Sequence, residues 1–507
     1  MNRESIKIFR IWSLVLLLAG VTFTSCDRDE LLEKNPISSI SNETAFESEA
    51  SVISALNAAY DPFQWQFNNN AHSFPQMFQS IRADDHHSQQ AAFWAAGLLY
   101  DDFPILPNNQ NVASVWAKWY KAIARANFAI LTAEDFSFTT TGLQERIIAE
   151  AKFIRGFAYF ELVRLFGGVP LITQAITSTD DDIFLPRASE ADVYAQIEAD
   201  LGAAVTALPS KGQTDNFRAT SGAAAALLAK VHLYQGEYSE TIKYTEQVIN
   251  SGLYQLEENY ADNFKLNNEF GKESIFEINY VDGLVGTNFE RNEAQEGSGS
   301  WQFMFMWAAG KWLSWGNMIP RQSLIALYDD NDQRKAATFL QPGDVVNSPG
   351  LEAIGWDPIR NPGFAVGSQA MNKKFFLTYE ELDQLLNVQQ SPLNEKVLRY
   401  SDVLLMHAEA SIMGGGGDGQ ASLDAVTQRA FGGTVAYTLE NIKLERRKEF
   451  ATEGWNRFTD LKRWGDLADA MSKVGKNFVA GRDEYLPIPQ SEINLVGENI
   501  LDQNPGY

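Results

Sequence analysis

The chain has 507 residues, of which 45% are hydrophobic and 21% are charged, as expected for a folded protein with a sizeable core. Its 65 acidic residues outnumber the 41 basic ones and give a formal charge of -24. Because no run of lysines or arginines offsets this charge, the composition argues against nucleic acids as partners and disfavours acidic polysaccharides.

The N-terminus has the pattern of a lipoprotein leader. It carries three positive charges, on Arg3, Lys7 and Arg10. The apolar stretch that follows, 11–21, is too short for a permanent membrane helix, and small residues then lead to Cys26, the only cysteine. We therefore expect a signal peptide over 1–25, acylation of Cys26, and a lipidated flexible tether over 26–41. The alternative is an ordinary signal peptide with a chance cysteine.

The region from 42 to 251 is predicted to be a helical scaffold, because apolar residues recur there at helical spacing. The pattern predicts helices that begin near Thr44 and over 112–131, 142–167, 189–208, 219–235 and 238–250. The last two form a hairpin around Gly236, whose turn and second helix resemble a tetratricopeptide hairpin. We expect stacked helical hairpins without a regular repeat.

From 252 to 394 the helical periodicity weakens, and glycine, proline, asparagine and aromatic residues become more frequent. We interpret this region as loops, short strands and short helices inserted into the helical body. Helices are predicted to return in the last region, 395–507, over 397–413, 439–452 and 459–473. The glycine run 414–417 is expected to be a flexible connector, and 485–490 an extended tail because of its two prolines.

The C-terminal region also contains charged residues that resemble a catalytic cluster. They are Arg399, Asp402, Glu409, Glu445, Arg446, Glu449, Arg457, Asp460 and Arg463, with Trp464 beside them. Their helical spacing indicates buried ion pairs that fix how helices cross. We therefore assign them a structural role and expect no catalytic residue among them.

Six blocks of sequence together carry a family resemblance. The first, at 149–171, is AEAKFIRGFAYFELVRLFGGVPL; the others are 185–189, 218–231, 397–410, ERRKEFATEGW continuing to 465, and QNPGY at 503–507. In this order and behind a lipoprotein leader they resemble the SusD/RagB family, the surface glycan-binding lipoproteins of Bacteroidota. The match is poorest over 60–110 and 270–390, where ligand specificity resides in this family.

The resemblance implies a mainly α, SusD-like fold with tetratricopeptide-like hairpins, as a single domain over 42–507. It implies a non-catalytic protein, anchored by lipid on the outer face of the outer membrane, that delivers a glycan to a SusC-type TonB-dependent transporter. No cofactor and no metal site are expected. Stacking aromatics and net acidity favour a neutral oligo- or polysaccharide.

Aromatic residues around position 300 are the first candidates for the binding site. Sugars present apolar C–H faces that stack on aromatic rings, while polar side chains satisfy their hydroxyl groups. The candidates are Trp301, Phe303, Trp307, Trp312 and Trp315. Residues 301–307 alternate between aromatic and other side chains, so a strand would place the aromatics on one face. A helix would divide them over two faces, and core packing would then explain them.

The second candidate is the polar segment 82–94, and the resemblance implies that a loop in this region faces the ligand. We expect Trp94 to stack on the sugar and Arg82, Asp84 and Asp85 to contact its hydroxyl groups. The simpler interpretation of the acidic residues is a solvated turn. The adjacent histidines at 86–87 are a weak signal for a zinc site, because such a pair rarely points at one ion.

Two other functions remain open from the sequence. A glycoside hydrolase needs only two carboxylates in a cleft, although no nucleophile elbow, P-loop, dinucleotide fingerprint or HExxH motif occurs. A helical adaptor that binds peptides or other nutrients is the second alternative. Binding of a glycan without its cleavage would distinguish the glycan-binding function from these two alternatives.

Overall fold

The computed structural model describes residues 46–68, 71–88, 100–177, 184–282, 318–341, 370–375, 377, 381 and 391–507. The chain divides into two units, 1–52 and 53–507. The predicted leader, Cys26 and the tether lie outside the described residues. Helix α4 (Glu49–Tyr60) begins in the first unit, and everything described below lies in the second. The predicted division at 251 and 394 stays a prediction.

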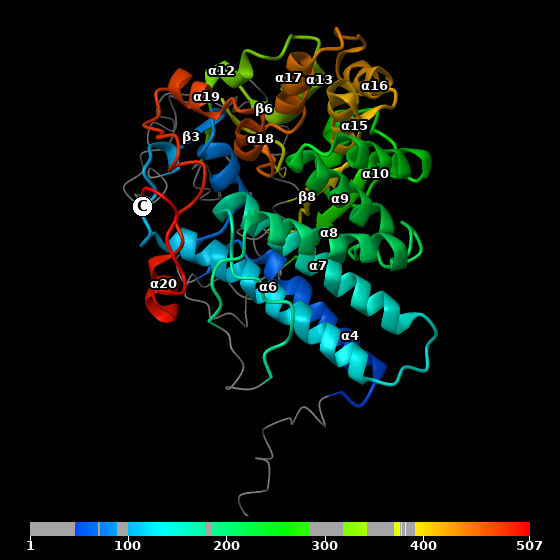
Figure 1. The fold of residues 1–507 in the computed structure, drawn as a ribbon. Helices are drawn as coiled ribbons and strands as arrows, with labels where there is room; N and C mark the ends of the chain where they lie inside the picture. Colours follow the sequence, from blue (N-terminus) through cyan, green and yellow to red (C-terminus); the bar gives the residue numbers. More distant parts are fainter. Residues whose placement is uncertain are drawn as a thin grey trace, which may run out of the picture. The chain divides into compact units, whose positions relative to one another are not determined.

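The second unit is built mainly from helices that pack against one another in chain order (Figure 1). They are α6 (Gln110–Asp135), α7 (Leu143–Phe166), α8 (Glu190–Ala207), α9 (Ser221–Gln235) and α10 (Tyr238–Asn250). Each contacts the next, and α10 continues the series by packing on α15 (Tyr400–Ala410). The five helices predicted between 112 and 250 are confirmed, with ends that differ by a few residues.

Local chemistry explains where these helices begin and end. The side chains of Ser189 and Thr220 accept backbone N–H groups in the first turns of α8 and α9, which are otherwise without partners. At the other end of α9, Gly236 adopts a φ of 76°, a left-handed conformation that a glycine takes without strain. This turn lets α10 fold back along α9.

The core is centred on α7, whose residues from Phe153 onward are almost all buried. The ring of Phe157 lies 4.9 Å from that of Phe63, 5.6 Å from Trp119 and 6.0 Å from Trp455. One aromatic cluster therefore joins the segment after α4, helix α6, helix α7 and the C-terminal region. Such contacts bury large apolar areas and hold the second unit together.

The strands are short and form antiparallel pairs. They are β1 (Phe67–Asn68) with β2 (Ala71–His72), β3 (His86–Ser88) with β5 (Met318–Pro320), β4 (Ser274–Ile278) with β8 (Glu395–Arg399), and β6 (Phe339–Leu340) with β7 (Met371–Asn372). Where the structure describes 252–394, it contains such strands and the short helices η3 (Tyr260–Phe264), η4 (Leu266–Asn268), α12 (Gln322–Ile325) and α13 (Gln333–Thr338). Loops and short elements were the prediction for this region.

Two predictions for the C-terminal region need correction, and one helix there was missed. Residues 397–399 belong to strand β8, because their backbone pairs with β4, and α15 begins only at Tyr400. The helix predicted over 459–473 is two helices, α18 (Arg457–Trp464) and α19 (Leu467–Lys473), because Gly465 is left-handed between them. Helix α16 (Gly419–Phe431) was not predicted.

One further C-terminal prediction holds, because helix α17 (Leu439–Glu449) lies where a helix was expected. The extended tail predicted over 485–490 is confirmed only in part: residues 486–489 lie outside helices and strands, a turn and a bend precede them, and Gln490 begins the short helix α20 (Gln490–Val496). The glycine run continues a short helical turn, η6 (Ser411–Gly415), and its left-handed glycines turn the chain toward α16. Among the described residues, no helix is both long enough and apolar enough to cross a membrane.

The predicted ion-pair network is confirmed. Arg399 donates to Glu449 at 2.9 Å, and Arg446 donates to Asp402 at 2.8 Å. All four of these side chains are buried. Similar contacts join Arg463 to Glu409 and Asp460, and the indole of Trp464 donates to Glu409. Buried charges need such partners, so these residues fix the packing of the C-terminal helices and strands.

Candidate functional site

One end of each of the two segments predicted to bind a ligand joins the described structure at the same strand pair. Strands β3 and β5 pair so that Ser88 is opposite Met318. The segments 89–99 and 283–317 follow and precede these two residues. They contain Trp94, Trp301, Phe303, Trp307, Trp312 and Trp315, and they lie outside the described residues. Their chain neighbours are nevertheless cross-strand partners, although 230 positions separate them in the sequence.

A second strand pair is fixed beside the first through Asn372. Its side-chain amide donates to the Met318 carbonyl oxygen at 2.6 Å, and its Oδ1 lies 3.1 Å from Nε2 of His86. Burial lowers the pKa of His86 to about 3, so the ring is neutral at ordinary pH and its Nε2–H donates to Asn372. Because Leu340 pairs with Met371, residues close to both ends of 342–369 meet at this pair.

Asp101 ties the ends of these segments together. Its Oδ2 accepts the Ser88 N–H at 3.0 Å, and its Oδ1 accepts Nη2 of Arg321 at 2.9 Å. Lys476 contributes a second cation, 3.0 Å from Oδ1. Burial lowers the pKa of this lysine to about 8, and the negative charge of Asp101 opposes the shift. We call β3, β5, β6 and β7, with Asp101 and Arg321, the strand platform.

The turn before β3 is held by two arginines from distant parts of the chain. The carboxylate of Asp84 accepts two hydrogen bonds from Arg457, at 2.7 and 2.8 Å, and Asp85 accepts Nε of Arg447 at 2.7 Å. Burial acts to raise the pKa of Asp84, but the charges of Arg457 and Arg447 prevail and lower it. Burial is the stronger effect on Asp85, whose pKa is raised.

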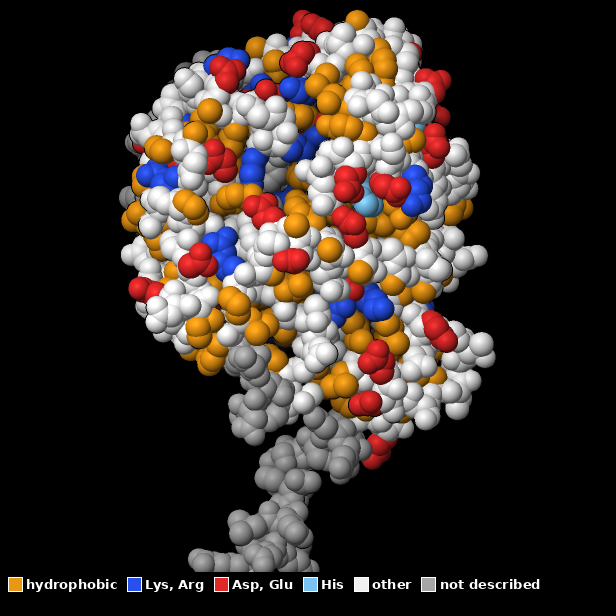
Figure 2. All heavy atoms as spheres, in the orientation of Figure 1, with side chains coloured by type: hydrophobic (Ala, Val, Ile, Leu, Met, Phe, Trp, Pro, Cys, Tyr) orange, Lys and Arg blue, Asp and Glu red, His pale blue; other side chains and the backbone are white. Residues whose placement is uncertain are grey.

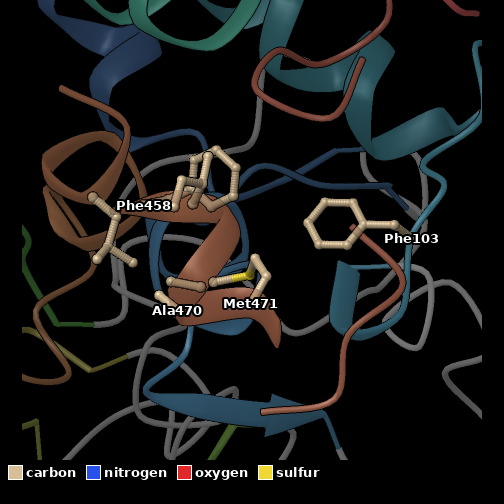
Figure 3. Close-up of a cluster of buried hydrophobic side chains, with 7 residues drawn as sticks. Phe103, Phe458, Ala470 and Met471 are labelled. Carbon is tan, nitrogen blue, oxygen red and sulfur yellow. The ribbon is translucent and has the colours of Figure 1, made fainter. Parts of the chain in front are cut away.

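Arg82 lies beneath this turn, against an apolar cluster. Its guanidinium stacks on the ring of Phe458, 3.9 Å from the centroid, and donates to the Asp483 carbonyl oxygen. Phe458 belongs to a cluster that also contains Phe103 and, from α19, Met471 (Figure 3). Burial lowers the pKa of Arg82 to about 10, which still leaves it charged at neutral pH.

Arg82, Asp84 and Asp85 are therefore parts of the protein interior. Their exposed fractions are 1, 5 and 2%. The carboxylates of Asp84 and Asp85 accept hydrogen bonds from arginines, and Nη2 of Arg82 donates to a backbone carbonyl oxygen, while Nε and Nη1 of Arg82 have no hydrogen-bond partner among the described residues. In this arrangement they hold the turn that carries β3. The prediction that they contact sugar hydroxyl groups stays a prediction, and it requires the turn to open.

Sequence reasoning missed the residues that organise the platform. Asp101, Arg321, Asn372 and Lys476 come from four separate parts of the chain and belong to no motif. Three of them are charged, but charge does not identify a site because charged residues are common on protein surfaces. The pairing of β3 with β5, the hydrogen bonds of Asn372 and the ion pair of Lys476 bring them together.

Comparison with known proteins gives a consistent result along the chain. A family model described as "Starch-binding associating with outer membrane" matches residues 30–233, and one described as "SusD family" matches 272–507. A SusD-like protein of Bacteroides ovatus is 28% identical, with 96% of this chain and 94% of that protein covered. SusD-like protein P2 of Formosa agariphila is 26% identical over 99% of this chain and all of that protein.

Solved structures agree with this assignment. A laminarin-binding SusD-like protein superposes with a TM-score of 0.76 at 29% identity, covering 91% of this chain and 100% of that one. Surface glycan-binding protein A from Bacteroides thetaiotaomicron, in complex with laminarihexaose, superposes with a TM-score of 0.77 at 25% identity. That match covers 90% of this chain and 99% of the other.

Proposed function

Because the chain belongs to the SusD/RagB family, we propose that it is a surface glycan-binding lipoprotein that captures an oligo- or polysaccharide without cleaving it. In this proposal Cys26 carries the lipid anchor on the outer membrane. The protein then passes its ligand to a SusC-type TonB-dependent transporter. A tether near the transporter raises the local concentration, so a modest affinity for the glycan is enough.

The pairing of Ser88 with Met318 is the observation that supports this proposal best. Trp315 is three residues before Met318, and Trp94 is six residues after Ser88. Both candidate segments are thus attached to one strand pair, and we propose that their aromatics stack on the two faces of one sugar.

We propose a neutral glycan of the laminarin type as the first ligand to test. Two of the structurally similar proteins are described as bound to laminarihexaose or as laminarin-binding. Laminarin carries no charge, which agrees with a protein whose formal charge is -24. An acidic polysaccharide would be repelled by such a surface unless a local cationic pocket attracted it.

A binding role also agrees with the chemistry of the described acidic residues. The buried carboxylates of Glu449, Glu453 and Asp460 accept hydrogen bonds from arginines. The arginine charges lower the pKa of Glu449 and of Asp460, so these two groups suit structural ion pairs better than proton donation to a leaving group.

Isothermal titration of the purified protein with laminarihexaose tests the proposal. We expect the Trp94→Ala and Trp315→Ala variants to bind at least about tenfold more weakly, equivalent to about 1.4 kcal/mol each. Phe217→Ala is the matched control, because Phe217 is an exposed aromatic that belongs to neither candidate segment. Chromatography after overnight incubation should show no shorter sugars.

Three results would contradict this function. Shorter products would identify a hydrolase, and binding of peptides with silence across a glycan panel would identify a peptide receptor. Unchanged affinity in both tryptophan variants would place the sugar elsewhere. The anchor is tested separately, since Cys26→Ala should move the protein out of the membrane fraction without changing its affinity for the sugar.

A further inference from the structure

We propose that Glu198, His232 and Glu237 bind a divalent metal ion of the zinc type on the side of the helical stack. One ligand atom from each residue lies within 4.8 Å of the other two. The residues come from three successive elements: α8, the last turn of α9, and the residue before α10. A bound ion would therefore join all three helices.

The set of donors suits such an ion. One imidazole nitrogen and two carboxylate oxygens are ordinary zinc ligands, and three protein ligands leave a fourth position for water. His232 is 6% exposed, and its ring is parallel to that of Tyr244, with centroids 5.6 Å apart. Burial and stacking hold this ligand in one orientation, which reduces the entropy lost when an ion binds.

The backbone brings Glu237 to His232 before any ion is present. After the last turn of α9, the left-handed Gly236 reverses the chain, and the Glu237 N–H donates to the His232 carbonyl oxygen at 2.9 Å. The Glu237 carboxylate then lies 2.5 Å from Nδ1 of His232. Glu198 is oriented by Gln235, which donates to its Oε1 at 2.7 Å. This leaves Oε2 for a metal, as is usual where an outer hydrogen bond orients a ligand.

The electrostatic balance at this place is unusual for the described part of the protein. Most of its buried acidic groups face an arginine or a lysine, whereas the half-buried Glu198 and the exposed Glu237 converge on one histidine. Lys243, which lies nearby on α10, pairs instead with Glu240 at 2.6 Å. Acidic side chains gather over α8, α9 and α10 on the face drawn in Figure 2. Two carboxylates near one imidazole attract a cation.

The three ligands also line a cavity of about 840 Å³, together with Glu240, Tyr244 and Met413. Ligands of a tetrahedral zinc ion lie about 3.3 Å apart when each bond is about 2.0–2.1 Å. The His232–Glu237 contact must therefore widen from 2.5 Å. Glu237 has room to move, because 47% of its side chain is exposed. The fourth position would then face the cavity.

Calorimetric titration of the purified full chain with ZnCl₂ tests this site. We expect one ion per chain and a loss of at least about tenfold in affinity in Glu237→Gln and in Glu198→Gln. Glu246→Gln is the matched control, because Glu246 is 45% exposed and also lies beside a histidine, 3.8 Å from His407. That pair has no third ligand within reach in the described structure. The control should bind zinc like the wild type.

Cobalt substitution adds a spectroscopic measurement. The wild type and Glu246→Gln should show the visible d–d bands of a Co²⁺ ion with nitrogen and oxygen ligands, and Glu237→Gln should lose them. Because Glu237 is partly exposed, its substitution leaves the helical core intact. Equal zinc binding by the wild type, Glu198→Gln and Glu237→Gln would show an adventitious ion only and would overturn the proposal. The absence of any zinc binding would also overturn it.

Discussion

The substitution Asp101→Asn tests whether the strand platform is held by charge. It preserves the size of the side chain but removes the negative charge that faces Arg321 at 2.9 Å and Lys476 at 3.0 Å. Only 2% of the Lys476 side chain is exposed, against 18% for Asp101. Breaking a fully buried ion pair costs about 3–5 kcal/mol. Because Asp101 is partly hydrated and asparagine still accepts one hydrogen bond, we expect a loss of about 2–3 kcal/mol.

Urea unfolding measured across pH makes this prediction specific. Lys476 has a pKa of about 8 in the folded protein, well below the ordinary value for lysine, so it loses its proton as the pH rises through that value. A neutral lysine needs no counter-charge, and the difference between wild type and variant should therefore narrow above about pH 9. We also expect the variant to bind laminarihexaose roughly threefold more weakly, because the segments 89–99 and 283–317 are attached to a strand platform that the substitution makes less ordered.

Asp469→Asn is the matched control. Asp469 pairs with Lys473 at 2.7 Å, but more than two thirds of each side chain is exposed, so its loss should change stability by less than about 1 kcal/mol. Equal stability of the Asp101 and Asp469 variants would refute the reasoning. So would a difference for Asp101→Asn that does not change between neutral and alkaline pH.

Three further predictions concern the scaffold. Arg399→Ala removes one of the cations that neutralise the buried Glu273, Glu449 and Glu453, and it should cost about 3–5 kcal/mol in chemical unfolding. Arg125→Ala, at a partly exposed pair, should cost less than about 1 kcal/mol. A Cβ at Gly222 would clash with the Tyr254 hydroxyl, so Gly222→Ala should destabilise the protein by about 1–3 kcal/mol. A Cβ at Gly202, in α8, would meet open space, so Gly202→Ala should raise the melting temperature. Burial raises the pKa of Glu269 to about 7, so wild-type stability should fall relative to Glu269→Gln as the pH rises from about 4.5 to about 7; parallel pH profiles would contradict this.

The helical scaffold was predictable because its information is local. Apolar stripes, capping side chains and glycines at helix ends lie within one element, as in α7 and the hairpin at Gly236. Strand β8 was missed because its sequence, EKVLR, has no alternation of apolar and polar residues. All five residues are buried, since Lys396 and Arg399 have carboxylate partners on β4 or just before it. Those partners are invisible in the local pattern.

The candidate site was less predictable because its contacts are distant in sequence. The polar turn containing Asp84 and Asp85 has the composition of a solvated loop. Its burial depends on Arg457 and Arg447, which are 373 and 362 positions away from their partners. The proposed metal ligands show the same limit, because Glu198 is 34 residues before His232 and only the packing of α8 on α9 brings them together. Single-sequence reasoning has no access to such distances.

The cross-strand partnership of Ser88 and Met318 has a consequence for engineering and for divergence. The segments 89–99 and 283–317 are far apart in the sequence, but each is attached to one strand of the same β3–β5 pair. Either can change length or side chains while the helices behind keep their packing. Under the proposed function, a chimera that takes only one of these segments from a relative with another ligand would combine two half-sites that evolved for different sugars. We expect the transfer of both segments, with β3 and β5 unchanged, to transfer the sugar specificity.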